Sequence, residues 1–288
     1  MIAIVTDSTC GLTREQAQTQ NITLLPMWYG TEQEAFEEQY LEETPTGVLT
    51  DDNVMMFTTK SPKLRDYYNA FKSCSNQGMD VICLTVSSRF STAYKKANEA
   101  KEMIQNANIT VIDSALTAGG MYLLLQRTIA LVKENRALSY IEEDLNEAKK
   151  KIGIVFSVED MNILRKSRRI GRVAQSTATI LNIRPILLCV NGTIVAGGVA
   201  RGTKAQTNRL LEKIPQEAKK VIVHYTEKTP AAILEQVFQS VKKAHQVQSI
   251  EKIPLGNVLK VHLGLNVIGI AWDANQDVQL NKKTKCRR

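Results

Sequence analysis

The chain has 288 residues, of which 43% are hydrophobic and 23% are charged, and its formal net charge is +8. This length and hydrophobic content suffice for a buried core and predict two domains. No run of eighteen apolar residues occurs, which argues against a membrane-spanning helix. The five cysteines lack a C-x-x-C pair and the three histidines do not cluster, so we expect reduced thiols, a cytoplasmic location, and no metal or cofactor.

Basic residues gather in three places, at Lys149–Lys151, at Arg165–Arg169 and in the tail Asn281–Arg288. Charge of this kind is compatible with nucleic-acid binding. However, no recognition motif accompanies it, and aromatic residues make up only 6% of the chain. An acidic protein partner or an anionic ligand explains the charge at least as well, so we predict no nucleic-acid partner.

Strand and helix patterns alternate through the first half of the chain. Apolar, β-branched runs predict strands, whereas capping residues and apolar residues at helical spacing predict helices. The predicted strands are Ile2–Val5, Ile22–Tyr29, Met79–Val86 and Ile109–Ile112. Predicted helices begin after Thr13, Ser61, Ser91 and Ser139, and a further one spans Thr117–Asn135. This alternation predicts a parallel sheet covered by helices on both faces.

Two details of this half are specific enough to be tested. Ser61 is expected to cap a helix whose first residue is Pro62, the preferred helical position for proline. The acidic stretch Thr31–Thr46 is interpreted as an irregular surface excursion, and Pro26 indicates an edge or a bend in the strand before it.

The pattern changes after Lys151. Two apolar runs, Ile186–Val190 and Thr193–Val199, flank Asn191-Gly192, which is the strongest two-residue hairpin signal. A hairpin mixed with helices indicates a mixed-sheet α+β domain. We therefore predict an N-terminal parallel α/β domain at residues 1–155 and a C-terminal α+β domain at residues 156–288, with the segment near 57–75 as a candidate to pack against the latter.

Polar turns follow the predicted parallel strands at Thr6–Thr9, Ser87–Ser91 and Asp113-Ser114. In parallel sheets, ligands bind at the carboxyl ends of the strands. Ser87–Ser91 is the most informative turn because a helix follows it, and the free amides of a helix N-terminus favour an anion. Serine is also a common helix cap, so this turn by itself does not decide between a cap and a binding site.

Six fragments, in order along the chain, resemble the motifs of the DegV family of bacterial lipid-binding proteins. They are Ile4–Thr9, Phe57–Pro62, Ser87–Tyr94, Val111–Ser114, the set Arg169-Ile170, Arg184–Ile186, Asn191-Gly192 and Arg201, and finally His262–Gly264. The chain departs from the family pattern at Thr92, Ser167-Arg168 and Leu265-Asn266, where the family has Gly, Gly-Gly and Pro-Gly. The order and spacing of the fragments together carry the resemblance.

The resemblance implies a DegV-like α/β fold with a lipid pocket between two α/β domains. It implies a carrier, not an enzyme, that binds a long-chain fatty acid and presents its carboxylate to a separate fatty acid kinase for phosphorylation to an acyl-phosphate. Thr59 and Ser91 are implied to bind the carboxylate with His262 beside it, and Thr58 and Thr92 are further candidates. Arg169 and Arg201 are implied to face the kinase.

Two alternatives stay open at this point. One is a serine-dependent hydrolase that uses Ser91 with His262 as its base, although the chain has no G-x-S-x-G elbow. The other is a regulatory protein that binds a small anion. No membrane span is expected, and transient contact with a membrane surface is left open.

Overall fold

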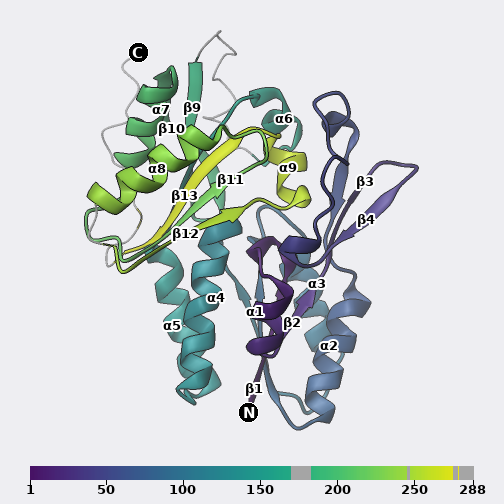
Figure 1. Cartoon of the computed structure of the whole chain (residues 1–288). Coiled ribbons are helices and arrows are strands. Elements are labelled where there is room, and N and C mark those ends of the chain that lie inside the picture. Colours follow the sequence, from purple (N-terminus) through teal and green to yellow (C-terminus); the bar gives the residue numbers. More distant parts are fainter. Residues whose placement is uncertain (170–182, 245–246, 275–277, 279–288) are drawn as a thin grey trace, which may run out of the picture.

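The computed structural model describes residues 1–169, 183–244, 247–274 and 278. Three sheets form its framework, and helices cover them (Figure 1). Ile170, His245 and the basic tail Asn281–Arg288 lie outside the described residues. In the part of the chain that is described, no helix is long and apolar enough to cross a membrane.

The first sheet has the order β2-β1-β6-β7, and all three of its pairings are parallel. Its strands are β1 (Ile2–Asp7), β2 (Ile22–Leu25), β6 (Asp80–Thr85) and β7 (Ile109–Asp113). Ile4 pairs with Ile82 and Thr6 with Leu84, so the predicted parallel sheet is confirmed. The carboxyl ends of β1 and β6 lie side by side, which brings their two polar turns together.

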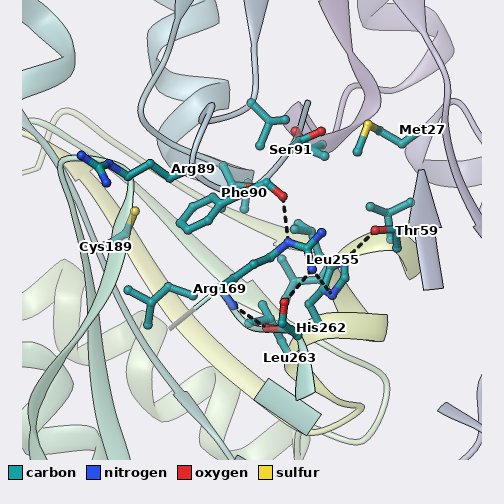
Figure 2. Close-up of a pocket in the computed structure, with 18 of the residues that line it drawn as sticks. Met27, Thr59, Arg89, Phe90, Ser91, Arg169, Cys189, Leu255, His262 and Leu263 are labelled. Atoms are coloured by element: carbon teal, nitrogen blue, oxygen red, sulfur yellow. Dashed lines mark hydrogen bonds between the residues drawn. The ribbon is translucent and has the colours of Figure 1, made fainter. Parts of the chain in front are cut away.

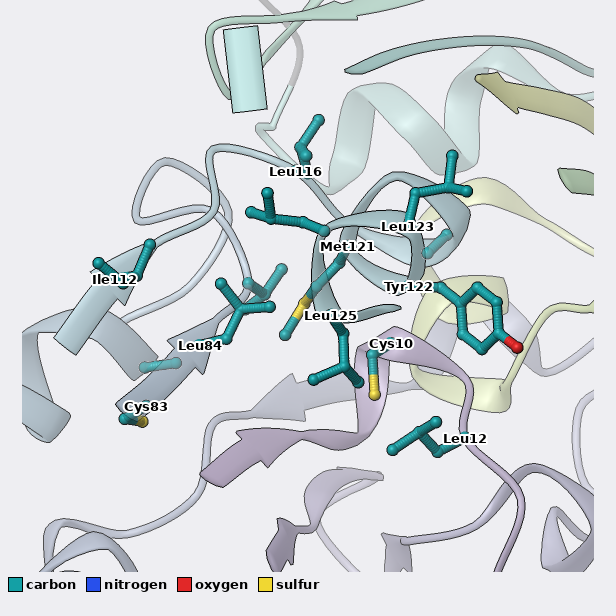
Figure 3. Close-up of a cluster of buried hydrophobic side chains, with 14 of the residues drawn as sticks. Cys10, Leu12, Cys83, Leu84, Ile112, Leu116, Met121, Tyr122, Leu123 and Leu125 are labelled. Carbon is teal, nitrogen blue, oxygen red and sulfur yellow. The ribbon is translucent and has the colours of Figure 1, made fainter. Parts of the chain in front are cut away.

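Helices cover this sheet on both faces, as predicted: α2 and α3 lie on one side and α4 and α5 on the other (Figure 1). The helices are α1 (Arg14–Thr19), α2 (Leu64–Asn76), α3 (Ala93–Glu102), α4 (Ala118–Lys133) and α5 (Leu138–Lys151). Met121 and Leu125 of α4 project toward Leu84 and Cys10 in the buried core (Figure 3). The core therefore fixes the N-terminal end of α4 against the polar turns.

The second sheet is mixed and has the order β10-β9-β8-β13-β11-β12. Its strands are β8 (Ile152–Val158), β9 (Ile183–Val190), β10 (Thr193–Arg201), β11 (Lys220–Tyr225), β12 (Ser249–Pro254) and β13 (Val267–Asp273). Only β11 and β12 run parallel to each other. The hairpin at Asn191-Gly192 is confirmed, and both residues have the positive φ angles, 48° and 72°, that a type I′ turn needs.

The two faces of the second sheet belong to different cores. Val155 of β8 lies in the apolar cluster under α7 (Thr203–Leu211) and α8 (Ala231–Ala244). Its neighbours Ile154 and Phe156 point the other way, because side chains alternate along a strand, and belong to the core shared with the parallel sheet. Two short helices, α6 (Met161–Lys166) and α9 (Asn257–Leu263), complete this half.

A third sheet of three strands contradicts two of the sequence predictions. The strands are β3 (Met27–Gly30), β4 (Ala35–Glu38) and β5 (Thr58–Lys60) in the order β4-β3-β5, and short 3-10 turns occur at Ser8–Cys10, Leu41–Glu43 and Val54–Met56. The single strand predicted at Ile22–Tyr29 is wrong, because the chain changes sheet at Pro26, which has no N–H for a ladder. The stretch Thr31–Thr46 is likewise partly ordered as β4, and not irregular throughout.

The helix predicted to begin at Pro62 begins instead at Leu64. The Asp66 carboxylate accepts the Lys63 N–H at 2.7 Å and thereby caps its first turn. Ser61, which was expected to be the cap, is buried and bonds to side chains of α3 and its approach. The prediction failed because tertiary partners occupy the hydroxyl that the local pattern assigned to a backbone amide.

The change of pattern predicted after Lys151 coincides with the start of the second sheet at Ile152. The domain boundary at residue 155 stays a prediction. The segment near 57–75 divides between the two halves. Phe57 packs with Val258 and Val261 of α9, whereas Tyr67 and Phe71 of α2 lie in the core of the parallel sheet.

Candidate functional site

A cavity of about 520 Å³ lies between the carboxyl ends of the parallel strands, the second sheet and α9. Most of its inner wall is apolar. The apolar lining comprises Met27, Val86, Phe90, Ala118, Ile154, Phe156, Leu164, Cys189, Ile194, Leu255, Val258, Leu259, Leu263 and Val267. Gly269 of β13 lines it as well, and Thr59, Arg169 and His262 lie together at one end, the polar end, whereas Arg89 lies on the opposite side of the view (Figure 2).

Three side chains at the polar end form one connected chain of hydrogen bonds. The Thr59 Oγ1 lies 2.7 Å from Nε2 of His262, and Nη1 of Arg169 lies 3.2 Å from Nδ1 of the same ring (Figure 2). Arg169 is held in turn by two carbonyl groups, since its Nε donates to Phe90 at 2.8 Å and its Nη1 to Ser167 at 2.9 Å. The chain thus ties α9 to the turn after β6.

The chemistry of these groups fixes the direction of every bond in the chain. Arginine only donates, so Nδ1 of His262 accepts. Burial, with a smaller contribution from Arg169, lowers the pKa of His262 to about 3, so the ring is neutral and its one proton is on Nε2. That N–H donates to Thr59 Oγ1, and the Thr59 hydroxyl keeps its own proton for another acceptor. Thr59 is therefore set to donate to an anion.

Ser91 also lines the cavity, where it is partly buried. Its Oγ accepts the Ala93 N–H at 3.2 Å, so the Ser91 side chain caps the N-terminus of α3, although the residue directly before the helix is Thr92. An oxygen that accepts from a backbone amide still has a proton to donate. Ser91 can thus cap the helix and bind an anion at the same time.

The two remaining carboxylate candidates occupy different surroundings. Thr92 lines the cavity, and its hydroxyl lies 3.0 Å from that of Ser61. Thr58 is exposed and does not line the cavity, and its hydroxyl donates to the Gly30 carbonyl at 3.4 Å. The structure brings Thr59, Ser91, Thr92 and His262 to one cavity and leaves Thr58 outside it.

Sequence reasoning missed four charged or titratable residues of the cavity wall, Lys60, Arg89, Lys96 and His224, of which the last two are hydrogen-bonded inside it. Lys96, on the first turn of α3, donates to Ser61 Oγ at 2.7 Å and to the Pro62 carbonyl at 3.1 Å. Lys96 lies three residues after Ala93, the first residue of α3, and is therefore close to the N-terminus of the helix. This position is the only signal in the sequence that Lys96 could belong to the site. His224 carries no local signal at all.

His224 is buried in the wall and bonds only to backbone groups. Its Nδ1 donates to the Ile253 carbonyl at 2.9 Å, so its Nε2 accepts the Gly119 N–H, 2.6 Å away. Burial lowers its pKa to about 4. A Cβ on Gly119 would lie 2.2 Å from Nε2, so glycine is required for this approach of α4. His224 therefore joins the second sheet to α4.

The charges of the cavity lining have one sign. Its charged residues are Lys60, Arg89, Lys96 and Arg169, and no aspartate or glutamate lines it among the described residues. The described residues also hold no group of three side chains that could ligate a metal ion. The arrangement suits an amphiphile with an anionic head.

The family model described as "uncharacterised protein, DegV family" matches residues 1–275. This chain belongs to the DegV family. A DegV domain-containing protein of Staphylococcus aureus is 27% identical over 279 residues, which cover 93% of this chain and 96% of that protein. Among solved structures, a fatty-acid-binding DegV protein from Thermus thermophilus has a TM-score of 0.84 at 22% identity over 95% of this chain and 99% of its own. A stearic acid-binding protein from Eubacterium ventriosum has a TM-score of 0.79 at 24% identity over 95% and 98%.

The positions where this DegV chain departs from the family motifs are accommodated locally. Arg168 has a φ of 54°, in the region that favours glycine, which explains why glycine suits this position. Leu265 is buried against α9, and the Asn266 amide donates to Glu159 at 2.8 Å. These departures leave the DegV fold intact.

The two arginines implied to face a kinase lie in unlike surroundings. Arg169 is partly buried in the cavity, as described above. Arg201 is exposed at the end of β10 and does not line the cavity. A role for either in contact with a kinase stays a prediction.

Proposed function

We propose that this protein is a carrier that binds a long-chain fatty acid and presents its carboxylate to a separate fatty acid kinase. The observation that carries the proposal is the cavity of about 520 Å³, with a mostly apolar lining, hydroxyl and cationic donors among its polar residues, and no acidic side chain in its described lining. The acyl chain would occupy the apolar part. The carboxylate would lie at Thr59 and Ser91.

Physical magnitudes favour a ligand of this kind. At ~0.8 kcal/mol per buried CH₂, a chain of about fourteen methylenes gains roughly 11 kcal/mol before the costs of association. Burial of a carboxylate costs several kcal/mol unless donors replace its water. The Thr59 hydroxyl, directed by His262, and the Ser91 hydroxyl are such donors.

The related proteins give independent support. The neighbours from Thermus thermophilus and Eubacterium ventriosum are described as binding fatty acid and stearic acid, respectively. Both have the fold of this chain, and the cavity of this chain lies between its two larger sheets.

The hydrolase alternative requires Ser91 to contact a basic group. Instead, Nε2 of His262 contacts Thr59, and both ring nitrogens of His224 are engaged by the backbone. Ser91 therefore has neither histidine as its base in this arrangement. The observation favours the carrier over a serine-dependent hydrolase.

Native mass spectrometry of the protein purified from cells tests lipid binding directly. We expect an added mass of a long-chain fatty acid, and a delipidated sample should bind palmitate in a calorimetric titration. Hexadecanol is the matched control, because it has the same chain length without the charge. Binding of hexadecanol as tightly as palmitate would contradict the assignment of the polar end.

The kinase half of the proposal is best tested at Arg201. We expect Arg201→Ala to retain palmitate binding, because Arg201 is exposed and does not line the cavity. The variant should lose kinase- and ATP-dependent formation of acyl-phosphate, because the guanidinium group is proposed to bind the kinase. Arg169→Ala should weaken both activities, since Arg169 holds His262. Full phosphorylation of the Arg201→Ala protein would contradict a kinase contact there.

A further inference from the structure

A buried carboxylate of the third sheet holds the start of α9. Glu38, the last residue of β4, accepts the Val258 N–H at 2.8 Å. The approach is close, because a Cβ on Gly256, directly before the helix, would lie 2.6 Å from Oε2 of Glu38. A larger residue there would displace the carboxylate. Glu38 thus serves the free amides of α9 in the way that a helix cap does, although it lies far away in the sequence.

A second side chain ties the same helix to the same sheet. Asn257, the first residue of α9, donates through Nδ2 to the Tyr29 hydroxyl of β3 and to the Pro45 carbonyl, each at 2.9 Å. Its Oδ1 accepts from the buried ammonium group of Lys260 at 3.2 Å. The Asn257 side chain is therefore engaged at both of its polar atoms, and the start of α9 is fixed relative to the third sheet.

The third sheet and α9 also carry the two side chains that direct a donor into the cavity. Thr59 belongs to β5, which pairs with β3, and His262 lies near the end of α9. Their hydrogen bond, with 2.7 Å between Thr59 Oγ1 and His262 Nε2, joins the sheet to the helix (Figure 2). Apolar packing joins the same two elements, but it is not directional. The hydrogen bonds at the start of α9 are directional, so they set the angle at which His262 meets Thr59.

The unfavourable burial of Glu38 indicates a role beyond packing. A carboxylate that loses its water is destabilising unless hydrogen bonds and opposite charge replace that water. Burial raises the pKa of Glu38 to about 7, although the Val258 N–H and the Lys260 ammonium group act in the opposite direction. An aliphatic residue would be buried more readily at this position, but it could not accept a hydrogen bond from a helix amide.

We propose that Glu38 is a positioning residue for the carboxylate of the fatty acid, which acts through α9 by setting His262 against Thr59. The proposal rests on the proposed function, because the Thr59 hydroxyl is the donor that is aligned. Glu38 itself does not line the cavity and would not touch the ligand. A hydrogen bond weakens steeply with angle, whereas apolar contacts tolerate small shifts. A loosened α9 should therefore weaken the binding of a charged head group more than that of an acyl chain.

Calorimetric titration of the delipidated protein with palmitate and with hexadecanol tests this role. Glu38→Met keeps the volume of the side chain and removes the acceptor, so palmitate binding should weaken about fivefold and hexadecanol binding less than about twofold. Glu38→Gln retains an acceptor for the Val258 N–H and should bind palmitate as the unaltered protein does. Glu37→Met is the matched control, because Glu37 is the exposed neighbour on β4 and the same charge is removed.

Two further variants keep the test independent of the fold of Glu38→Met. Tyr29→Phe removes only the hydroxyl that accepts from Asn257, and it should also weaken palmitate more than hexadecanol. A double-mutant cycle with Thr59→Val identifies the route of the effect. If Glu38 acts through Thr59, Glu38→Met should add no further loss of palmitate affinity to that of Thr59→Val.

Three outcomes would overturn the positioning role. Equal loss of palmitate and hexadecanol would make Glu38 a support of the apolar wall alone. Additive losses in the cycle would separate Glu38 from Thr59, and unchanged palmitate affinity in Glu38→Met would leave Glu38 with no effect on the ligand. Failure of the unaltered protein to bind palmitate would instead refute the proposed function itself.

Discussion

Two histidines in the cavity wall have the same charge state and different tasks. Burial lowers the pKa of both, to about 4 for His224 and about 3 for His262, so both rings are neutral near pH 7. The ring nitrogens of His224 bond to backbone groups of Gly119 and Ile253, whereas those of His262 bond to the side chains of Arg169 and Thr59. In both rings burial is the main cause of the lowered pKa, so the pKa does not distinguish them. Their hydrogen-bond partners do: His224 joins backbone groups of the fold, and His262 bonds to a side chain of the proposed site.

The largest expected effect is the loss of stability in His224→Ala. The change leaves the Gly119 N–H and the Ile253 carbonyl without partners in a buried place, and it opens a void, so we expect a cost of about 3 kcal/mol. Urea unfolding of the two variants measures it, with His262→Ala as the comparison. The contrast would fail if His262→Ala cost as much as His224→Ala.

The second effect concerns Glu38, which contacts the helix that carries His262. Its buried carboxyl group accepts the Val258 N–H at 2.8 Å at the start of α9. Burial raises the pKa of Glu38 to about 7 from an ordinary value of 4.5. Between these two pH values the unfolded chain releases a proton that the folded protein keeps. Stability from this group therefore falls as pH rises from 4.5 to about 7, by at most about 3 kcal/mol, and stays low above that.

Unfolding of the unaltered protein and of Glu38→Gln at several pH values measures this contribution. The difference in stability between the two should change across the window from 4.5 to about 7, because glutamine can accept the Val258 N–H without titrating. The lowered pKa values of the two histidines reduce stability as pH falls below 6.5, which opposes the effect of Glu38. Both proteins contain these histidines, so their contribution cancels when one stability is subtracted from the other. A difference that is constant with pH would contradict a raised pKa for Glu38.

The third prediction separates neighbouring threonines of β5. Thr59→Val removes the hydroxyl that is proposed to donate to the carboxylate, so palmitate affinity should fall about tenfold, or about 1.5 kcal/mol. Thr58→Val removes a hydroxyl that bonds to the Gly30 carbonyl outside the cavity, and it should leave affinity unchanged. Titration calorimetry of both variants decides between them. An equal loss in both would show an effect of the strand and not of the Thr59 hydroxyl.

The smallest effect is expected for Ser91→Ala. The Ser91 hydroxyl is also proposed as a donor for the carboxylate, but its removal frees the Ala93 N–H, which can donate to the ligand instead. We therefore expect a loss of about threefold in palmitate affinity, which is less than that for Thr59→Val. A loss larger than that of Thr59→Val would make Ser91 the principal donor and would reverse the order of the two.

The sequence by itself determined the elements whose signals are local. The parallel sheet followed from apolar strands alternating with helices, and the hairpin from Asn191-Gly192, because both depend on residues close together in the chain. The family resemblance then pointed to Thr59, Ser91 and His262. It could not supply the bond between Thr59 and His262 or the direction of that bond.

Only the tertiary structure decided which side chains meet. Thr59 and His262 are 203 residues apart, and Ser61 and Lys96 are 35 apart, so no periodicity relates either pair. Sequence separation also explains why α2 begins at Leu64 and not at the predicted Pro62. The Ser61 hydroxyl bonds to Thr92 and Lys96, which are too far along the chain for a local pattern to include. Buried polar groups take the partners that the packed sheets bring to them, because water is no longer present to satisfy them.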